Sequence, residues 1–227
     1  MEQIVRIDMT TGEARLEPLP EAYRLLGGRA LTSRIVADEV DPLCDPLGPH
    51  NRLVLAPGLL SGTVLSSSNR ISAGGKSPLT GGIKEANAGG NTALRLAQWG
   101  IRAVVVQGAP QPGAWYIAVV GPEGCRLEPA GDLVGLGNYA AAERLLARFG
   151  RRAALALAGP ACEMRLNVAG IANTDPEGRP SRVAARGGLG AVMGAKGLKA
   201  LVVLDPGGGA APGMAEPARW REHTRPY

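Results

Sequence analysis

Alternating and continuous apolar stretches predict that short strands make up much of the chain. Residues 3–18 alternate between apolar and polar positions on both sides of a TTGE turn, a pattern typical of a β-hairpin. The continuous apolar runs at 101–108, 115–121 and 198–206 indicate strands that are buried on both faces of a sheet. Further strands are expected within residues 52–62, 153–159 and 165–173.

Helical periodicity is found in three segments, at residues 21–40, 91–100 and 138–150. The second and third each begin at an asparagine that can cap the helix, Asn91 or Asn138, and each ends at a glycine. The strands are numerous, the helices are short, and turn-forming glycine (33 residues) and proline (18 residues) are frequent. The sequence therefore predicts an α+β fold of layered sheets with short helices.

An internal repeat relates the two halves of the chain. The segment LVLAPG at residues 53–58 resembles LALAGP at 155–160, and residues 87–108 align with 184–205. The offset between matching residues stays near one hundred throughout. Two explanations are open: a duplicated β/α fold, or the general likeness of two common strand–turn–helix–strand units.

Duplication predicts one domain at residues 1–206, built of repeats at about 1–110 and 111–206. The stretch PGGGAAPG that follows is typical of a flexible linker. Residues 207–227 are therefore expected to be a linker or the truncated start of a next domain.

The duplicated halves each place a Gly-Gly pair before a predicted helix. The first N–H groups of a helix lack partners within it and carry the positive end of its dipole, so they suit phosphate. Glycine allows the ligand to approach the backbone closely. The basic side chains near these turns are Arg70, Lys76, Arg182 and Arg186. Two such sites facing each other would hold two phosphorylated molecules or one molecule with two phosphates.

Charge composition is compatible with an anionic ligand. The net charge is +5, and all but four of the 25 basic residues are arginines, whose planar group suits phosphate. A genome rich in G and C would produce the same bias. The site arginines could also pair with surface carboxylates such as Glu85 or Asp175.

Two nucleotide-binding motifs are matched only in part. GGKS at 74–77 resembles a Walker A loop, but Arg70 stands where that loop needs its first glycine, and Pro78 follows where a helix should open. GLGAVMG at 188–194 has GxGxxxG spacing, yet the preceding PSRVAAR is not an apolar strand. An NAD(P)-binding protein therefore remains an alternative interpretation.

Cysteine and histidine positions argue against several kinds of site. Cys44, Cys125 and Cys162 stand far apart and form no CxxC pair, which argues against a zinc site, a disulfide framework or an iron–sulfur cluster carried by this chain alone. His50 and His223 lie in turn-like or terminal surroundings, which gives little support to a histidine-based triad. We expect a cytoplasmic protein with no membrane or nucleic-acid partner.

Two long stretches resemble the N-terminal domain of the aldehyde ferredoxin oxidoreductase family. They are NRISAGGKSPLTGGIKEANAGGNTALRLAQWGIRAVVVQG and SRVAARGGLGAVMGAKGLKALVV, and the resemblance covers residues 3 to about 205. It implies a tungsten (or molybdenum) oxidoreductase whose metal is held by the dithiolenes of two pterins. In that family this domain is a duplicated β/α structure under the cofactor, and a magnesium ion bridges the two pterin phosphates.

The resemblance also implies roles for individual residues. The main-chain carbonyls of Asn87 and Val183 correspond to the magnesium ligands. The positions that correspond to the family's pterin-binding residues are Arg70, Asn87, Gly89, Arg182, Val183, Arg186, Gly187 and Gly188. Catalytic residues are not assigned in this chain.

Cluster-binding cysteines and the substrate pocket belong to later domains of that family. The chain is accordingly expected to be a fragment, a separate subunit or a remnant, inactive by itself. Once completed, it would oxidise aldehydes to carboxylic acids, with a 4Fe-4S cluster in the other domains or in a partner and with ferredoxin or an iron–sulfur subunit as electron acceptor. The alternative is a non-catalytic module that binds a pterin or another phosphorylated ligand.

Overall fold

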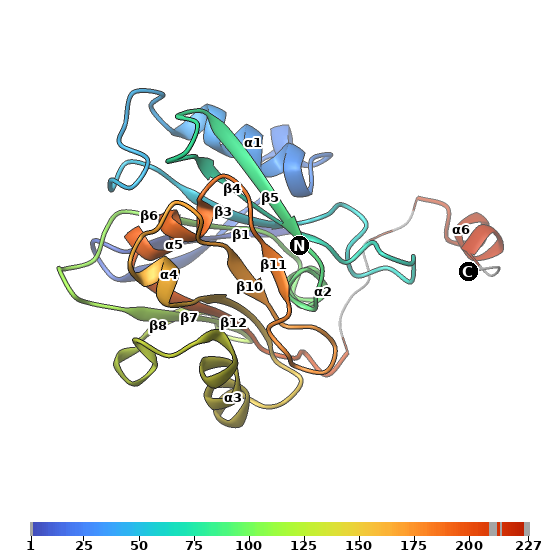
Figure 1. Cartoon of the computed structure of the whole chain (residues 1–227). Helices are drawn as coiled ribbons and strands as arrows, with labels where there is room; N and C mark the ends of the chain where they lie inside the picture. Colours follow the sequence, from blue (N-terminus) through green and yellow to red (C-terminus); the bar gives the residue numbers. More distant parts are fainter. Residues whose placement is uncertain (1, 209–212, 214, 225–227) are drawn as a thin grey trace.

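Two six-stranded sheets stacked face to face form the centre of the molecule (Figure 1). The structure is a computed structural model that describes residues 2–208, 213 and 215–224. The first sheet has the order β2-β1-β6-β3-β4-β5 and the second the order β11-β10-β9-β12-β7-β8.

The strands of the first sheet are β1 (Gln3–Asp8), β2 (Glu13–Pro18), β3 (Leu53–Pro57), β4 (Ile71–Lys76), β5 (Ile83–Ala88) and β6 (Ile101–Gln107). Those of the second are β7 (Tyr116–Gly121), β8 (Gly124–Pro129), β9 (Ala154–Ala158), β10 (Ile171–Asn173), β11 (Arg182–Ala184) and β12 (Leu198–Val203). The helices are α1 (Gly28–Glu39), α2 (Thr92–Gln98), α3 (Asn138–Phe149), α4 (Pro160–Glu163), α5 (Leu189–Ala195) and α6 (Pro217–Thr224), with 3-10 turns η1 (Glu21–Tyr23) and η2 (Gly131–Leu133).

Strand order confirms the duplicated fold. Replacing β1 to β6 by β7 to β12 turns the order of the first sheet into that of the second. Both first strands pair in parallel with the last strand of their repeat, and both pairs contain a register shift near the start. The register agrees as well: Asn87 pairs with Ser72 in the first sheet, as Val183 pairs with Ala172 in the second. Asn87 and Val183 therefore occupy equivalent positions.

The Gly-Gly pairs of the two repeats are offset from each other by one residue. Three residues (89–91) connect β5 to α2, whereas four (185–188) connect β11 to α5. When the two helices are superposed, Gly90 therefore corresponds to Gly187. The extra residue lies in the second connection, next to Arg186.

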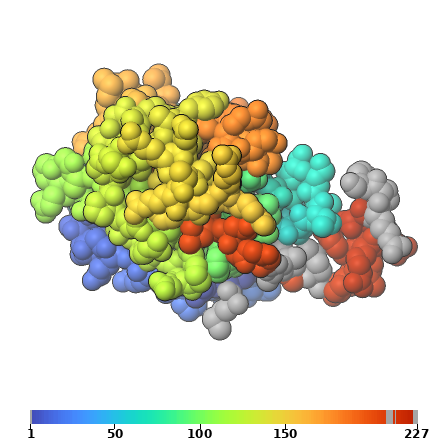
Figure 2. All heavy atoms as spheres, turned by 90° about the horizontal axis from the view of Figure 1, so that it is seen from below, coloured from blue at the N-terminus to red at the C-terminus, as the bar shows by residue number. Residues whose placement is uncertain are grey.

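Apolar side chains fill three layers around the sheets. The layer between the sheets contains inward-facing residues of both sheets and the apolar sides of α2 and α5, including Leu55, Leu96 and Val192. The outer face of the first sheet packs on α1, and that of the second packs on α3. Figure 2, seen from the α3 side, shows α3 and the second repeat covering that face. Strands buried on both faces explain the continuous apolar runs.

Some elements differ from the sequence-based expectation. Residues 165–173 contain only the short strand β10, and the helix α4 precedes it. Asn138 is the first residue of α3 and does not cap it, since Gly137 holds the N-cap position. Within the predicted linker, α6 buries none of its residues and stands apart from the sheets in Figure 1. No described helix is long and apolar enough to cross a membrane.

Polar contacts between the repeats fix their relative position. The buried ammonium of Lys196 in the second repeat donates hydrogen bonds to the main-chain oxygens of Gly48 (3.0 Å), Pro49 (3.1 Å) and Gly108 (2.9 Å). Asn91 is the N-cap residue of α2, as predicted, but its side chain donates to the main-chain oxygen of Asp175 at 3.2 Å. These hydrogen bonds tie the second repeat directly to the first.

Close packing of α4 on α5 leads to a stability prediction. A Cβ at Gly194 would collide with the main-chain oxygen of Cys162. We expect Gly194→Ala to lower the free energy of unfolding by about 2 kcal/mol or more, because overpacking outweighs the gain in helix propensity of roughly 1 kcal/mol. Urea unfolding measures this change. Gly131→Ala is the control, since nothing lies within 4 Å of a Cβ there; equal stability of both variants would contradict the packing argument.

Candidate functional site

Two adjoining cavities lie where the edge strands β5 and β11 of the two sheets meet. The first cavity has a volume of about 570 Å³, and the second about 600 Å³. Arg70, Asn87 and Val183 line both of them. The first cavity is also lined by Asn69, Gly89, Asn91, Ser181 and Arg182, and the second by Arg29, Ser72, Glu85 and Arg186.

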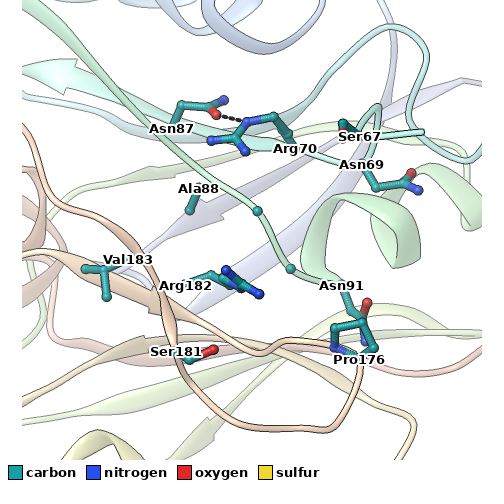
Figure 3. A pocket seen from close by; sticks show the side chains of 12 residues that line it. Ser67, Asn69, Arg70, Asn87, Ala88, Asn91, Pro176, Ser181, Arg182 and Val183 are labelled. Atoms are coloured by element: carbon teal, nitrogen blue, oxygen red, sulfur yellow. Dashed lines mark hydrogen bonds between the residues drawn. The ribbon is translucent and has the colours of Figure 1, made fainter. Parts of the chain in front are cut away.

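Arg70 belongs to the first repeat and immediately precedes β4. Its Nε donates a hydrogen bond to the side-chain oxygen of Asn87, drawn as a dashed line in Figure 3. Gly89 leaves the backbone bare beside it, since a Cβ there would meet only Arg70 Nη1, at 3.8 Å. A ligand can therefore approach both the guanidinium and the main chain.

The second repeat contributes Arg182 and Val183 from β11 and Arg186 from the turn that follows. Arg70 and Arg182 lie on opposite walls of the first cavity in Figure 3. Arg70 and Arg186 line the second cavity together. The two cavities share the wall formed by Arg70, Asn87 and Val183, and arginines from both repeats line them.

These arginines have no carboxylate partner within 4 Å among the described residues, unlike most other arginines of the chain. The alternative that the site arginines pair with Glu85 or Asp175 is therefore wrong. Glu85 pairs with Arg29 at 3.3 Å, and Asp175 pairs with Arg179 at 3.1 Å. The positive charge of Arg70, Arg182 and Arg186 is therefore available to an anionic ligand.

Two predicted contributions to the cradles are not found in the cavities. The ammonium of Lys76 is buried and bonds the main-chain oxygens of Pro42 and Cys44, so it holds the proline-rich loop. Gly187 and Gly188 both have positive φ, of 67° and 68°. They line neither cavity.

Packing explains the glycines at 187 and 188. Ser77 Oγ donates a hydrogen bond to the main-chain oxygen of Gly187 at 2.8 Å. A side chain at Gly187 would collide with Lys84, and one at Gly188 would collide with Pro78. The pair therefore seats the second repeat on the 77–84 turn of the first.

Asn87 and Val183 have a geometry that fits their proposed main-chain role. They lie at equivalent positions on the edge strands of the two sheets and line both cavities. Edge strands present main-chain groups that no neighbouring strand pairs. Carbonyl oxygens are suitable ligands for magnesium. A role as magnesium ligands stays a prediction.

Sequence reasoning missed several lining residues, including Arg29, Asn69, Glu85 and Ser181. Asn69 directly precedes Arg70, but nothing in its local sequence distinguishes it from a turn residue. Arg29 and Glu85 are far apart in the chain, and only the packing of α1 beside β5 brings them together.

Two of the three thiols, those of Cys125 and Cys162, lie in surroundings that disfavour metal binding. Burial raises the pKa of the Cys125 thiol to about 12 and that of Cys162 to about 11. A protonated thiol is a poor metal ligand. Within the described residues, no group of three or more His, Cys, Asp or Glu side chains could hold a metal ion.

Comparisons with known proteins agree with the fold and the motifs. The sequence matches the family described as aldehyde ferredoxin oxidoreductase, N-terminal domain, over residues 4–205. The tungsten-containing aldehyde ferredoxin oxidoreductase of Pyrococcus furiosus is 36% identical over 205 residues, which cover 88% of this chain and 33% of that protein. The protein of the same name from Thermococcus kodakarensis is 35% identical, with the same coverage of both chains.

A solved structure is similar as well. It is the active site complex BamBC of benzoyl coenzyme A reductase with 1,5-dienoyl-CoA, with a TM-score of 0.87 and 30% sequence identity, covering 97% of this chain and 32% of that chain. The present chain spans about a third of the length of the curated relatives it matches. These comparisons confirm the resemblance found in the sequence, and this chain belongs to the family of the aldehyde ferredoxin oxidoreductase N-terminal domain.

Proposed function

We propose that this chain is the base on which a tungsten (or molybdenum) enzyme holds two pterin phosphates. The proposal rests on three arginines that line two adjoining cavities and have no carboxylate partner among the described residues. Arg70 comes from the first repeat, and Arg182 and Arg186 come from the second. A duplicated fold suits a cofactor assembly made of two like halves. One pterin phosphate would occupy each cavity.

The residues present fit such a group. No carboxylate lines the first cavity among the described residues, so a doubly charged phosphate meets Arg70 and Arg182 without repulsion. In the second cavity the carboxylate of Glu85 is paired with Arg29 at 3.3 Å, which offsets its charge. Bare backbone at Gly89 permits close approach. The main-chain oxygens of Asn87 and Val183 would hold a magnesium ion between the two phosphates.

The chemistry of the bound cofactor would be a two-electron change at tungsten or molybdenum. The residues of this chain would bind and orient the phosphates and fix the distance between them, without moving a proton or contacting the substrate. We propose that the remaining domains or a partner subunit supply the substrate pocket and a 4Fe-4S cluster, that the substrate is an aldehyde, and that ferredoxin or an iron–sulfur subunit accepts the electrons, in the cytoplasm.

In this proposal, residues 1–206 form the cofactor-binding domain, and residues 207–227 lead to the next part of the enzyme. The chain by itself would offer one exposed, arginine-lined face and would not oxidise aldehydes. A non-catalytic pterin-binding module and an NAD(P)-binding protein are the competing possibilities.

Metal and pterin analysis of the complete enzyme separates these possibilities. We expect tungsten or molybdenum with two pterins per copy of this chain, and aldehyde oxidation coupled to viologen reduction only in the complete enzyme. Pterin without redox activity would favour the binding module, and bound dinucleotide would contradict the proposal. Turnover by this chain purified without partners would contradict its role as a base alone. Activity with an aromatic coenzyme A thioester, and none with aldehydes, would show that the proposed aldehyde substrate is wrong and that such a thioester is the substrate.

A further inference from the structure

A continuous chain of hydrogen bonds runs beneath Arg70 along the wall of the second cavity. Arg70 Nε donates to Asn87 Oδ1, and Asn87 Nδ2 donates to Ser72 Oγ at 3.2 Å. Ser72 Oγ donates in turn to Glu85 Oε1 at 2.7 Å. The other carboxylate oxygen of Glu85 accepts from Arg29 Nε at 3.3 Å.

We propose that Ser72 and Glu85 are positioning residues that set the orientation of Arg70 before an anion binds. The inference rests on the function proposed above, because it assumes that Arg70 binds a phosphate. An amide side chain can be turned by half a rotation, which exchanges its oxygen and nitrogen. Ser72 gives its proton to Glu85 and therefore can only accept from Asn87. This directs the nitrogen of Asn87 to Ser72 and its oxygen to Arg70.

The charges along the chain support this role. The acceptor that Arg70 contacts is a neutral amide, so the guanidinium keeps its full charge while its Nε is held and its two terminal nitrogens remain for a ligand. The Glu85 side chain is only 7% exposed, and its charge is balanced by Arg29. The carboxylate thus orders the chain without neutralising Arg70.

The second repeat lacks this device. Register equivalence places Ala172 at the position of Ser72, Val183 at that of Asn87 and Gly170 at that of Arg70. Arg182 and Arg186 have no side-chain hydrogen bond among the described residues. The two halves of the site therefore differ. Arg70 is oriented before the ligand binds, whereas Arg182 and Arg186 would become ordered only on contact with the ligand.

Binding of inorganic pyrophosphate, measured by calorimetry without added magnesium, tests the inference on this chain. We expect Ser72→Ala to weaken the affinity about three- to tenfold, as for one lost hydrogen bond, and Arg70→Ala to weaken it about tenfold or more. In the Arg70→Ala background, Ser72→Ala should have no further effect, because it acts through Arg70. The exposed Ser66→Ala is the matched control and should bind as the wild type does.

Glu85 provides a second, independent test. Glu85→Gln keeps an oxygen that accepts from Ser72 and should bind pyrophosphate at least as tightly as the wild type. Glu85→Ala removes the same charge and also the acceptor, so it should bind pyrophosphate about three- to tenfold more weakly than Glu85→Gln. Equal losses from Ser72→Ala in both backgrounds, or no loss in the wild type, would overturn the positioning role. An unchanged affinity in Arg70→Ala would instead overturn the proposed function. Thermal unfolding of each variant identifies any that fail to fold, and the remaining variants decide.

Discussion

Under the proposed function, replacing Arg186 with alanine should lower the affinity of the complete enzyme for a pterin cofactor by about one to two orders of magnitude, because each charge-assisted contact to phosphate is worth roughly 1.5–3 kcal/mol. Arg186 lines the second cavity and has no carboxylate partner among the residues described. The fold should be unaffected, since the side chain is exposed. Pterin fluorescence after denaturation and extraction, measured at increasing dilution of the enzyme, gives the retained fraction.

Arg151→Ala is the matched control, because Arg151 is also exposed and has no ion pair among the described residues, but lines neither cavity. It should retain pterin as the wild type does. Arg186→Lys should recover only part of the loss, since lysine keeps the charge but not the planar group that binds phosphate through two nitrogens. Equal retention in Arg186→Ala and Arg151→Ala would mean that Arg186 does not bind the cofactor.

Lys196→Met should lower the free energy of unfolding by about 3 kcal/mol, because it removes a buried hydrogen-bond donor. Methionine keeps an apolar stem of similar length but leaves three main-chain oxygens, of Gly48, Pro49 and Gly108, without their donor. Each unsatisfied buried acceptor costs about 1–3 kcal/mol, and the loss of the costly burial of a charge offsets part of the sum. Urea unfolding at pH 7 measures the difference.

The pH dependence of this stability has a defined sign. Burial lowers the pKa of Lys196 from 10.5 to about 8. Between these values the unfolded chain binds more protons than the folded one, so the free energy of unfolding from this group rises from about pH 8 to pH 10.5. Lys196→Met should lack that rise. Lys84→Met is the control, since Lys84 makes no side-chain hydrogen bond or ion pair among the described residues; a loss as large as that of Lys196→Met would contradict the account.

The sequence is most informative where apolar residues alternate or run continuously. The strands β1, β2, β3, β6, β7, β9 and β12 all coincide with such stretches. The strands β4, β5, β8 and β11 were not predicted, because ISAGGK, IKEANA, GCRLEP and RVA are short or rich in small and charged residues. Their pairing is decided by the sheet they join, and β5 and β11 are the strands that carry the site.

The sequence identified some residues of the candidate site correctly and misassigned others. Most of the positions that the family resemblance indicates do line the cavities: Arg70, Asn87, Gly89, Arg182, Val183 and Arg186. Lys76 was misassigned because a buried lysine that caps a loop looks the same in sequence as a lysine that binds phosphate. Gly187 and Gly188 have the unusual backbone that was expected, but they serve contact between the repeats. The hydrogen-bond chain below Arg70 could not be predicted, because residues on α1, β4 and β5 meet only in the folded protein.

In the proposed function, both repeats hold one cofactor assembly through its phosphates. A crystal structure of the complete enzyme with its cofactor tests this proposal most directly. We expect one pterin phosphate in each cavity, with oxygens within hydrogen-bond distance of Arg70 and Arg182 in the first and of Arg186 in the second. We also expect a magnesium ion on the main-chain oxygens of Asn87 and Val183. Phosphates bound by other domains, with these arginines facing solvent, would contradict the proposal.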